Sequence, residues 1–310
     1  MATGPGRECQ MQQPNFPAND LVIACVAENR PYWAERVYNL AFSLRTFGGN
    51  LAQARMCAYF VDGLERRFEA MLQALDVECR VVDGFPTPVP QTNKLRMLEC
   101  FSHEEARVLV ALDCDIVIVD DFSSSISSHA ICGVPASVSP MRPNEWQSLL
   151  ALLGLRPDTR NIKMVYTAEE LQVPYLNSGA LFIPAQYNKE LTICWKRYIQ
   201  ELLTLHMTLN WTARTWFYLD QIALTCALLA SELPLELLDV THNFPTNIVV
   251  HESALPQSTA IRILHYHRHL KPSGHLRPTP TPIADQAIQR FNTALSRRLQ
   301  SPPSDLSAGG

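Results

Sequence analysis

The sequence predicts an α/β protein whose mixed, mostly parallel β-sheet is flanked by helices on both faces. Short apolar runs, typical of buried strands, alternate along the chain with segments of helical periodicity. The chain has 310 residues, of which 47% are hydrophobic and 18% are charged. A chain of this length and composition can bury a large core, which excludes disorder as its main state.

The first half of the chain is expected to supply most of the parallel sheet. Residues 32–47 place apolar side chains at Trp33, Val37, Leu40 and Leu44, a spacing that predicts a helix. The alternation of strands with helices predicts a mostly parallel sheet that is covered on both faces. The expected strands are 21–26, 55–61, 77–82 and 107–111, and the other expected helices are 65–75 and 93–101.

The second half is less regular and begins with a serine-rich turn at 123–128. The expected helices are 145–153, 189–203, 213–229 and 283–299, and the expected strands are 175–183 and 262–267. A proline-rich linker at 278–282 precedes the last helix. We expect residues 20–300 to form a single domain, with disordered tails at 1–19 and 301–310.

The charge balance argues against a general affinity for nucleic acid. The chain has 26 Lys and Arg against 30 Asp and Glu, a formal net charge of -4. From residue 252 onward, however, the chain contains seven basic residues and only three acidic ones. This local excess indicates a site for a smaller anion.

The cysteines predict a cytoplasmic protein with reduced thiols. There are nine of them, an odd number, and none forms a C-x-x-C pair. The first twenty residues are polar and do not resemble a signal peptide. No run reaches the roughly 18 apolar residues of a membrane span, so none is expected.

The run 108–119 is the most informative segment, because a hydrophobic strand there leads into Asp113-Cys114-Asp115. Alternate residues of a strand face the same way, so both carboxylates are expected to project together at its carboxyl end, where ligands of α/β sheets bind. A divalent cation that carries a diphosphate would neutralise both charges. The alternative is a pair of acids that cap the following turn.

Residues 263–272 bring histidines and basic residues together. His265, His267 and His269 occupy alternate positions and resemble a metal cluster, although hard cations usually need only one of them. Arg268 and Lys271 are suited to a phosphate. The alternatives are a solvated basic strand end and a three-histidine zinc site.

Two further segments carry polar groups within apolar surroundings. Asn177-Ser178-Gly179 interrupts an apolar strand, where the glycine allows a ligand or a backbone to approach and the polar side chains suit a sugar. An ordinary bulge is the alternative. Asp220-Gln221 opens a long helical stretch, and the helix dipole alone is sufficient to explain Asp220.

In this order and spacing, these segments resemble glycosyltransferase family 8, which has the GT-A fold and includes glycogenin and bacterial lipopolysaccharide galactosyltransferases. The residues 92–95 resemble the lysine helix of that family, and residues 26–32 resemble its uracil pocket. The resemblance covers residues 20–272. The matching motifs are Asp113/Asp115, Asn177-Ser178-Gly179, Asp220-Gln221 and His265 with Lys271-Pro272.

The resemblance implies a metal-dependent, retaining transfer of a hexose from a UDP-sugar. The implied metal is Mn²⁺ or Mg²⁺, held by Asp113, Asp115 and His265. The implied contacts to the donor are Val26, Asn29 and Tyr32 for the base, Lys271 for the diphosphate, and Asn177, Asp220 and Gln221 for the sugar. Lys94 and Ser178 are also implied to bind the donor. Lys94, Asp220 and Gln221 are the implied catalytic residues. Arg268 and Ser273 depart from the family, which commonly has Gly and Trp there.

Two alternatives stay open. A non-catalytic relative would bind a nucleotide sugar without turning it over. A phosphatase of the haloacid-dehalogenase type also has a strand that ends in Asp-x-Asp. In this chain, however, several elements precede the motif, and no later Gly-Asp-x-x-x-Asp follows to supply the acidic pair that such a phosphatase needs for Mg²⁺. The acceptor and the oligomeric state cannot be derived from the sequence.

Overall fold

The structure is a computed structural model, and it describes residues 16–102, 104–166, 169–209, 212–250, 255 and 260–300. The strands are β1 (Leu21–Glu28), β2 (Arg55–Val61), β3 (Val77–Val82), β4 (Val108–Asp113), β5 (Ile116–Ile118), β6 (Ile131–Pro135), β7 (Ile162–Lys163), β8 (Glu170–Leu171), β9 (Leu176–Pro184), β10 (Leu235–Leu237), β11 (Phe244–Pro245) and β12 (Ile263–His265). The α-helices are α1 (Pro31–Phe47), α2 (Arg66–Gln73), α3 (Leu95–Glu99), α4 (Pro143–Leu153), α5 (Ala185–Leu209), α6 (Ala213–Phe217), α7 (Leu219–Ser231) and α8 (Pro282–Gln300). The 3-10 helices are η1 (Ala18–Asp20), η2 (Gly49–Leu51), η3 (Pro90–Lys94), η4 (Ser123–Ser125) and η5 (Val240–His242).

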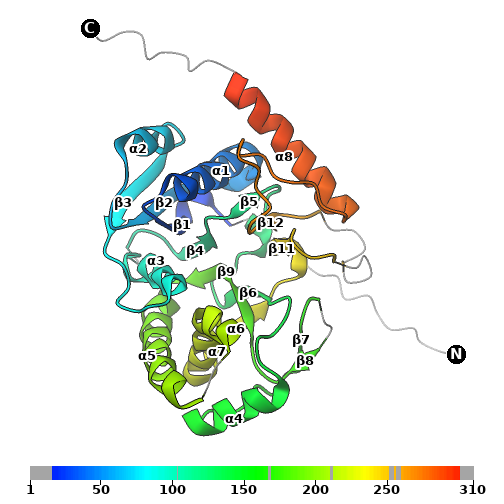
Figure 1. Ribbon diagram of the computed structural model, residues 1–310. Helices are drawn as coiled ribbons and strands as arrows, with labels where there is room; N and C mark the ends of the chain where they lie inside the picture. Colours follow the sequence, from blue (N-terminus) through cyan, green and yellow to red (C-terminus); the bar gives the residue numbers. More distant parts are fainter. Residues whose placement is uncertain are drawn as a thin grey trace, which may run out of the picture.

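The main sheet has seven strands in the order β10-β6-β9-β4-β1-β2-β3 (Figure 1). Strands β4, β1, β2 and β3 run parallel, whereas β9 is antiparallel to both of its neighbours, β4 and β6. A second sheet pairs β12 with β11 and β5. The expected α/β architecture with a mixed, mostly parallel sheet is confirmed.

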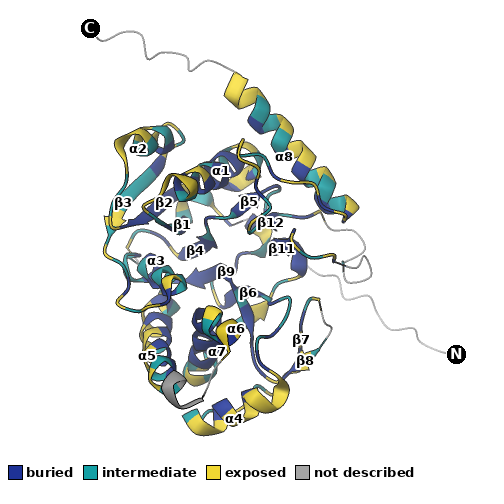
Figure 2. Cartoon of the chain, viewed as in Figure 1, coloured by how far each residue is buried: buried dark blue, intermediate teal, exposed yellow. Residues whose placement is uncertain are grey.

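Helices cover both faces of the sheet because side chains alternate along each strand. On β1, Val22 and Ala24 belong to a buried cluster that includes residues of α3, α5 and α7. The intervening Leu21 and Ile23 belong to a second cluster with residues of α1. Figure 2 shows the central strands β1, β4 and β9 as mostly buried between these helices. A third cluster packs α8 against β12.

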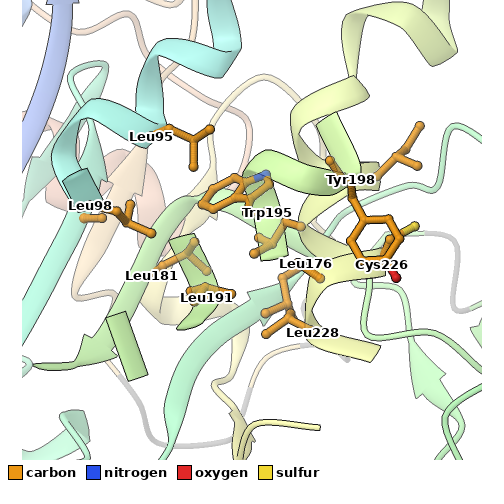
Figure 3. Close-up of a cluster of buried hydrophobic side chains, with 14 of the residues drawn as sticks. Leu95, Leu98, Leu176, Leu181, Leu191, Trp195, Tyr198, Cys226 and Leu228 are labelled. Atoms are coloured by element: carbon orange, nitrogen blue, oxygen red, sulfur yellow. The ribbon is translucent and has the colours of Figure 1, made fainter. Parts of the chain in front are cut away.

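The hydrophobic cluster beneath α7 holds the start of that helix in place. Figure 3 shows Trp195 of α5 beside Leu95 and Leu181. Trp195 is 1% exposed, and its indole Nε1 donates a 2.9 Å hydrogen bond to the backbone oxygen of Asp220. A buried indole N–H needs such a partner, so this bond fixes where the first turn of α7 begins.

Several boundaries differ from the sequence predictions. The expected helix at 213–229 is two helices, because Tyr218 has a non-helical backbone (φ -100°, ψ 21°). The helix expected at 93–101 starts as η3, and the short strands β6 and β10 were not predicted. Both pair with partners distant in sequence, so local patterns carry little signal for them.

Part of the expected N-terminal tail is ordered. Phe16 is buried, and its backbone N–H donates to the oxygen of Ser123. Residues 1–15 and 301–310, also expected as tails, lie outside the described residues. Among the described helices, none combines the length and the hydropathy that a membrane crossing requires.

Candidate active site

A pocket of about 860 Å³ lies at the carboxyl end of β4, beside β1 and the start of β9. Ligands of α/β sheets usually bind at this edge, and the volume is in the range of small-molecule sites. The sequence-predicted residues that line it are Val26, Lys94, Asp113, Asp115, Asn177, Asp220, Gln221 and His265.

One buried ammonium group joins three of the sequence motifs. The Nζ atom of Lys94, at the end of η3, lies 3.0 Å from a carboxylate oxygen of Asp113 on β4. It also lies 2.8 Å from Ser178 Oγ on β9 and 3.4 Å from Asp220 Oδ2 on α7. Ser178 Oγ donates in turn to Asp220 Oδ2 at 2.8 Å. We call these four residues the Lys94 cluster.

The electrostatics of the Lys94 cluster favour a charged lysine. Burial acts to lower the pKa of Lys94, but the carboxylates of Asp113 and Asp220 outweigh it and raise that pKa. Burial raises the pKa of Asp220, while Lys94 and the hydrogen bond from Ser178 oppose the rise. Lys94 is therefore protonated at neutral pH and supplies a fixed positive charge in the pocket.

Asp115 is held by a second set of contacts. Its Oδ1 lies 3.1 Å from His265 Nε2, and its Oδ2 accepts a 2.9 Å hydrogen bond from Arg36. The other ring nitrogen of His265, Nδ1, lies 3.0 Å from Asn243 Oδ1, which leaves Nε2 directed at Asp115. Burial acts to raise the pKa of Asp115, but His265, His267 and Arg36 lower it well below its usual range.

Turns bring these side chains together, which corrects the expectation of alternation along one strand. β4 ends at Asp113, and Asp115 lies in the turn that leads into β5. β12 ends at His265, and His267 follows with a left-handed backbone (φ 49°). The ring centroids of His265 and His267 are 3.8 Å apart.

Only glycine fits at position 179, because the side chains of His265 and Asp113 approach its backbone closely. A Cβ atom at this position would lie 2.7 Å from His265 Cε1 and 2.8 Å from Asp113 Oδ2. The sequence predicted a close approach here by a ligand or a backbone. In the structure the neighbours are the side chains of two other motifs.

Some sequence-predicted residues do not line the pocket. Asn29 and Lys271 are exposed, Tyr32 is 44% exposed, and Ser178 is buried behind Lys94. Glu28 and Trp33, which are adjacent in sequence to Asn29 and Tyr32, line it instead, as does Arg268, three residues before Lys271.

Arg36 is a site residue that the sequence analysis missed. It is 2% exposed on α1, and its guanidinium lies 4.2 Å from the ring centroid of Tyr32 and 4.8 Å from that of Trp33. The available signal was its position four residues after Tyr32, on one helix face. An arginine on a helix is usually exposed, so only the fold reveals its burial and its contact with Asp115.

The side chains present fit a divalent cation. Among the described residues, Asp115, His265 and His267 each offer a ligand atom, and these atoms lie within 4.8 Å of one another. Burial, together with the neighbouring His265, lowers the pKa of His267 to about 3. Its imidazole is therefore neutral at neutral pH, which is the form that binds metals.

Comparison with known proteins points to sugar transfer. A family model described as the Rhodobacterales glycosyltransferase domain matches residues 23–231. No curated protein sequence matches the chain significantly. An active-site mutant of LgtC superposes with a TM-score of 0.60 at 13% identity, and the alignment covers 91% of this chain and 98% of that chain.

Two further solved structures share the architecture. The galactosyltransferase LgtC in complex with donor and acceptor sugar analogs has a TM-score of 0.57 at 13% identity, with coverage of 91% of this chain and 98% of that chain. Mouse xyloside xylosyltransferase 1, in its apo form, has a TM-score of 0.50 at 12% identity, with coverage of 80% and 98%. At these identities the similarity concerns the fold, and it confirms the expected GT-A architecture.

Proposed function

Since the chain belongs to the Rhodobacterales glycosyltransferase domain family, we propose that it transfers a hexose from a UDP-sugar to an acceptor with retention of the anomeric configuration. The observation that carries this proposal is the convergence of four separate motifs on one pocket. Lys94, Asp113, Asp220 and His265 come from distant parts of the sequence and all line it. Such a convergence of charged groups in a pocket is typical of an active site.

We propose that a divalent metal, Mn²⁺ or Mg²⁺, assists the transfer. Asp115 and His265 are suited to hold it, since Asp115 Oδ1 and His265 Nε2 lie 3.1 Å apart. Asp113 was implied as a further ligand by the motif, although it is also paired with Lys94. A bound divalent cation neutralises the charge that develops on a departing diphosphate.

The donor sugar is proposed to contact Asn177, Asp220 and Gln221. Asp220 is 2% exposed, and its Oδ2 is engaged by both Ser178 and Lys94. A carboxylate held in this way is a poor nucleophile, which favours entry of the acceptor on the face that the diphosphate leaves. Trapping of a covalent glycosyl-enzyme through Asp220 would overturn this front-face mechanism.

The nucleotide is proposed to lie along β1 and the loop after β12. Val26, Glu28 and Trp33 line the pocket on the side of β1 and are suited to the base, next to the motif residues Asn29 and Tyr32. On the other side, Arg268 lines the pocket as a cation for the diphosphate. Lys271, implied for this role by the family pattern, follows three residues later on the exposed part of the same loop.

The test is nucleotide release from a panel of sugar nucleotides in the presence of Mn²⁺, by the unchanged protein and by Asp115→Ala. We expect release from a UDP-hexose by the unchanged protein and no release by Asp115→Ala. Removal of the metal with EDTA should stop release, and added Mn²⁺ should restore it. If no sugar nucleotide is bound or turned over, the proposal fails.

The same preparation separates the alternative functions. Binding of a sugar nucleotide without release would identify a non-catalytic relative. Hydrolysis of an aryl phosphate that is lost in Asp113→Asn would identify a phosphatase instead.

We also propose that the protein works in the cytoplasm. The support is the cysteine chemistry: the eight cysteines within the described residues are free thiols, and five of them are buried. Alkylation of these thiols under denaturing conditions, in freshly lysed cells and without prior reduction, tests this proposal. Disulfides found in freshly lysed cells would contradict it.

A further inference from the structure

His267 lies where a metal ligand is expected, although the family pattern does not assign it that role. The turn after β12 gives His267 a left-handed backbone with φ 49°, a conformation that is uncommon for residues other than glycine. This turn sets its ring beside that of His265, with the centroids 3.8 Å apart and the planes at 37°. Both rings line the same pocket as Asp115.

The contacts of Asp113 differ from those of Asp115. Both carboxylate oxygens of Asp113 lie 3.0 Å from the ammonium of Lys94, and Asp113 Oδ2 lies 3.8 Å from His265 Nε2. Asp115 instead directs Oδ1 at His265 Nε2 at 3.1 Å. The group of ligand atoms within 4.8 Å of one another comprises Asp115, His265 and His267, without Asp113.

From this geometry we propose that His267 is a protein ligand of the bound cation, together with Asp115 and His265. Among the described residues, neither ring nitrogen of His267 has a hydrogen-bond partner in the protein, so a lone pair is available. This proposal rests on the proposed function, which supplies the bound metal, and it adds one residue to the metal site.

Two imidazoles and one carboxylate define the chemistry of this site. Nitrogen ligands suit Mn²⁺ and other transition metals, whereas Mg²⁺ prefers an all-oxygen octahedral environment. Three protein ligands leave coordination positions open for the oxygens of a diphosphate. We therefore expect the chain to select Mn²⁺ over Mg²⁺ even before a nucleotide is present.

The experiment counts the histidine nitrogens bound to Mn²⁺ by pulsed electron paramagnetic resonance. The sample is the full chain with one equivalent of Mn²⁺ and no nucleotide. We expect two coordinated imidazole nitrogens in the unchanged protein and one in His267→Asn, with Mn²⁺ affinity at least about tenfold weaker. Asparagine tolerates the left-handed backbone, so this variant preserves the turn.

His269→Ala is the matched control, since His269 lies two residues further on and lines the same pocket. It should keep two nitrogens. A single coordinated nitrogen in the unchanged protein, an unchanged count in His267→Asn, or no Mn²⁺ binding would overturn the proposal. Nucleotide release, measured separately on the same preparation, distinguishes the two proposals. Turnover by a protein with one coordinated nitrogen would overturn the role of His267 and leave the proposed function standing. Two coordinated nitrogens without turnover would support the metal site and contradict the proposed function.

Discussion

The ammonium of Lys94 lies 3.0 Å from Asp113 and 3.4 Å from Asp220, so one cation links the end of the central strand β4 to the first turn of α7. The side chain of Lys94 is 13% exposed and that of Asp220 is 2% exposed. Buried charges of this kind are sensitive to loss of a single partner, because the remaining charges stay desolvated.

Replacement of this cation should weaken both folding and catalysis. Lys94→Met leaves the buried carboxylate of Asp220 and the partly buried carboxylate of Asp113 without their counter-ion, and we expect a loss of about 3–5 kcal/mol in the free energy of unfolding. Urea denaturation measures this loss, and nucleotide release should disappear. The control is Lys196→Met, whose pair with Glu99 is 45% exposed on the lysine side and should contribute less than about 1 kcal/mol. Equal losses in both variants would contradict the prediction.

A methyl group at Gly179 should damage the site more than the fold. Gly179→Ala places a Cβ within 2.8 Å of both His265 and Asp113, so one of these side chains has to move. We expect nucleotide release to fall by at least about tenfold, since small misplacements of reacting groups have large effects on rate. Gly84→Ala is the control, since its backbone is not left-handed and the added Cβ has no neighbour closer than 3.4 Å. Full activity of Gly179→Ala would contradict the prediction, because it would mean that His265 or Asp113 can move without loss of catalysis.

Asn243 should tune metal affinity without touching the metal. Its Oδ1 lies 3.0 Å from His265 Nδ1 and orients the ring that faces Asp115. Loss of such a partner typically weakens metal binding by about 10–100-fold, so Asn243→Ala should weaken Mn²⁺ binding by that factor. Calorimetric titration with Mn²⁺ provides the measurement, with the exposed Asn144→Ala on α4 as control. An unchanged dissociation constant in Asn243→Ala would rule out the orienting role.

Asp239 should make stability depend on pH, because it anchors η5, the helix just before Asn243. Burial acts to raise the pKa of Asp239, but hydrogen bonds from His242 and Thr241 lower it to about 2, from 3.8. A carboxyl group with a lowered pKa in the folded state stabilises the fold above the unfolded value. Its contribution should therefore be present above about pH 4 and disappear as the pH falls towards 2.

Unfolding of the unchanged protein and of Asp239→Asn, measured from pH 7 to pH 2, tests this expectation. The difference in unfolding free energy should be constant near neutral pH and shrink below pH 4. A difference that grows as the pH falls would mean that the pKa is raised instead.

The longer strands β1, β2, β3, β4 and β9, like the acidic and glycine motifs, were predictable because their signals are local. The strands expected at 55–61 and 77–82 match β2 and β3 in both bounds. β2 is an almost continuous apolar run, whereas the edge strand β3 alternates apolar and polar residues. The break between α6 and α7 at Tyr218 was not predictable, because both flanking segments have helical periodicity.

Residue type and spacing along the chain are sufficient to predict the α/β class, the position of Asp113 at the end of a central strand and the family resemblance. Three other features became apparent only from the folded chain: Arg36 is buried against Asp115, Asn243 orients His265, and His267 turns back towards the pocket. These contacts join residues from different elements. Their geometry depends on how α1, β5 and β12 pack, and no periodicity within a single segment encodes that packing.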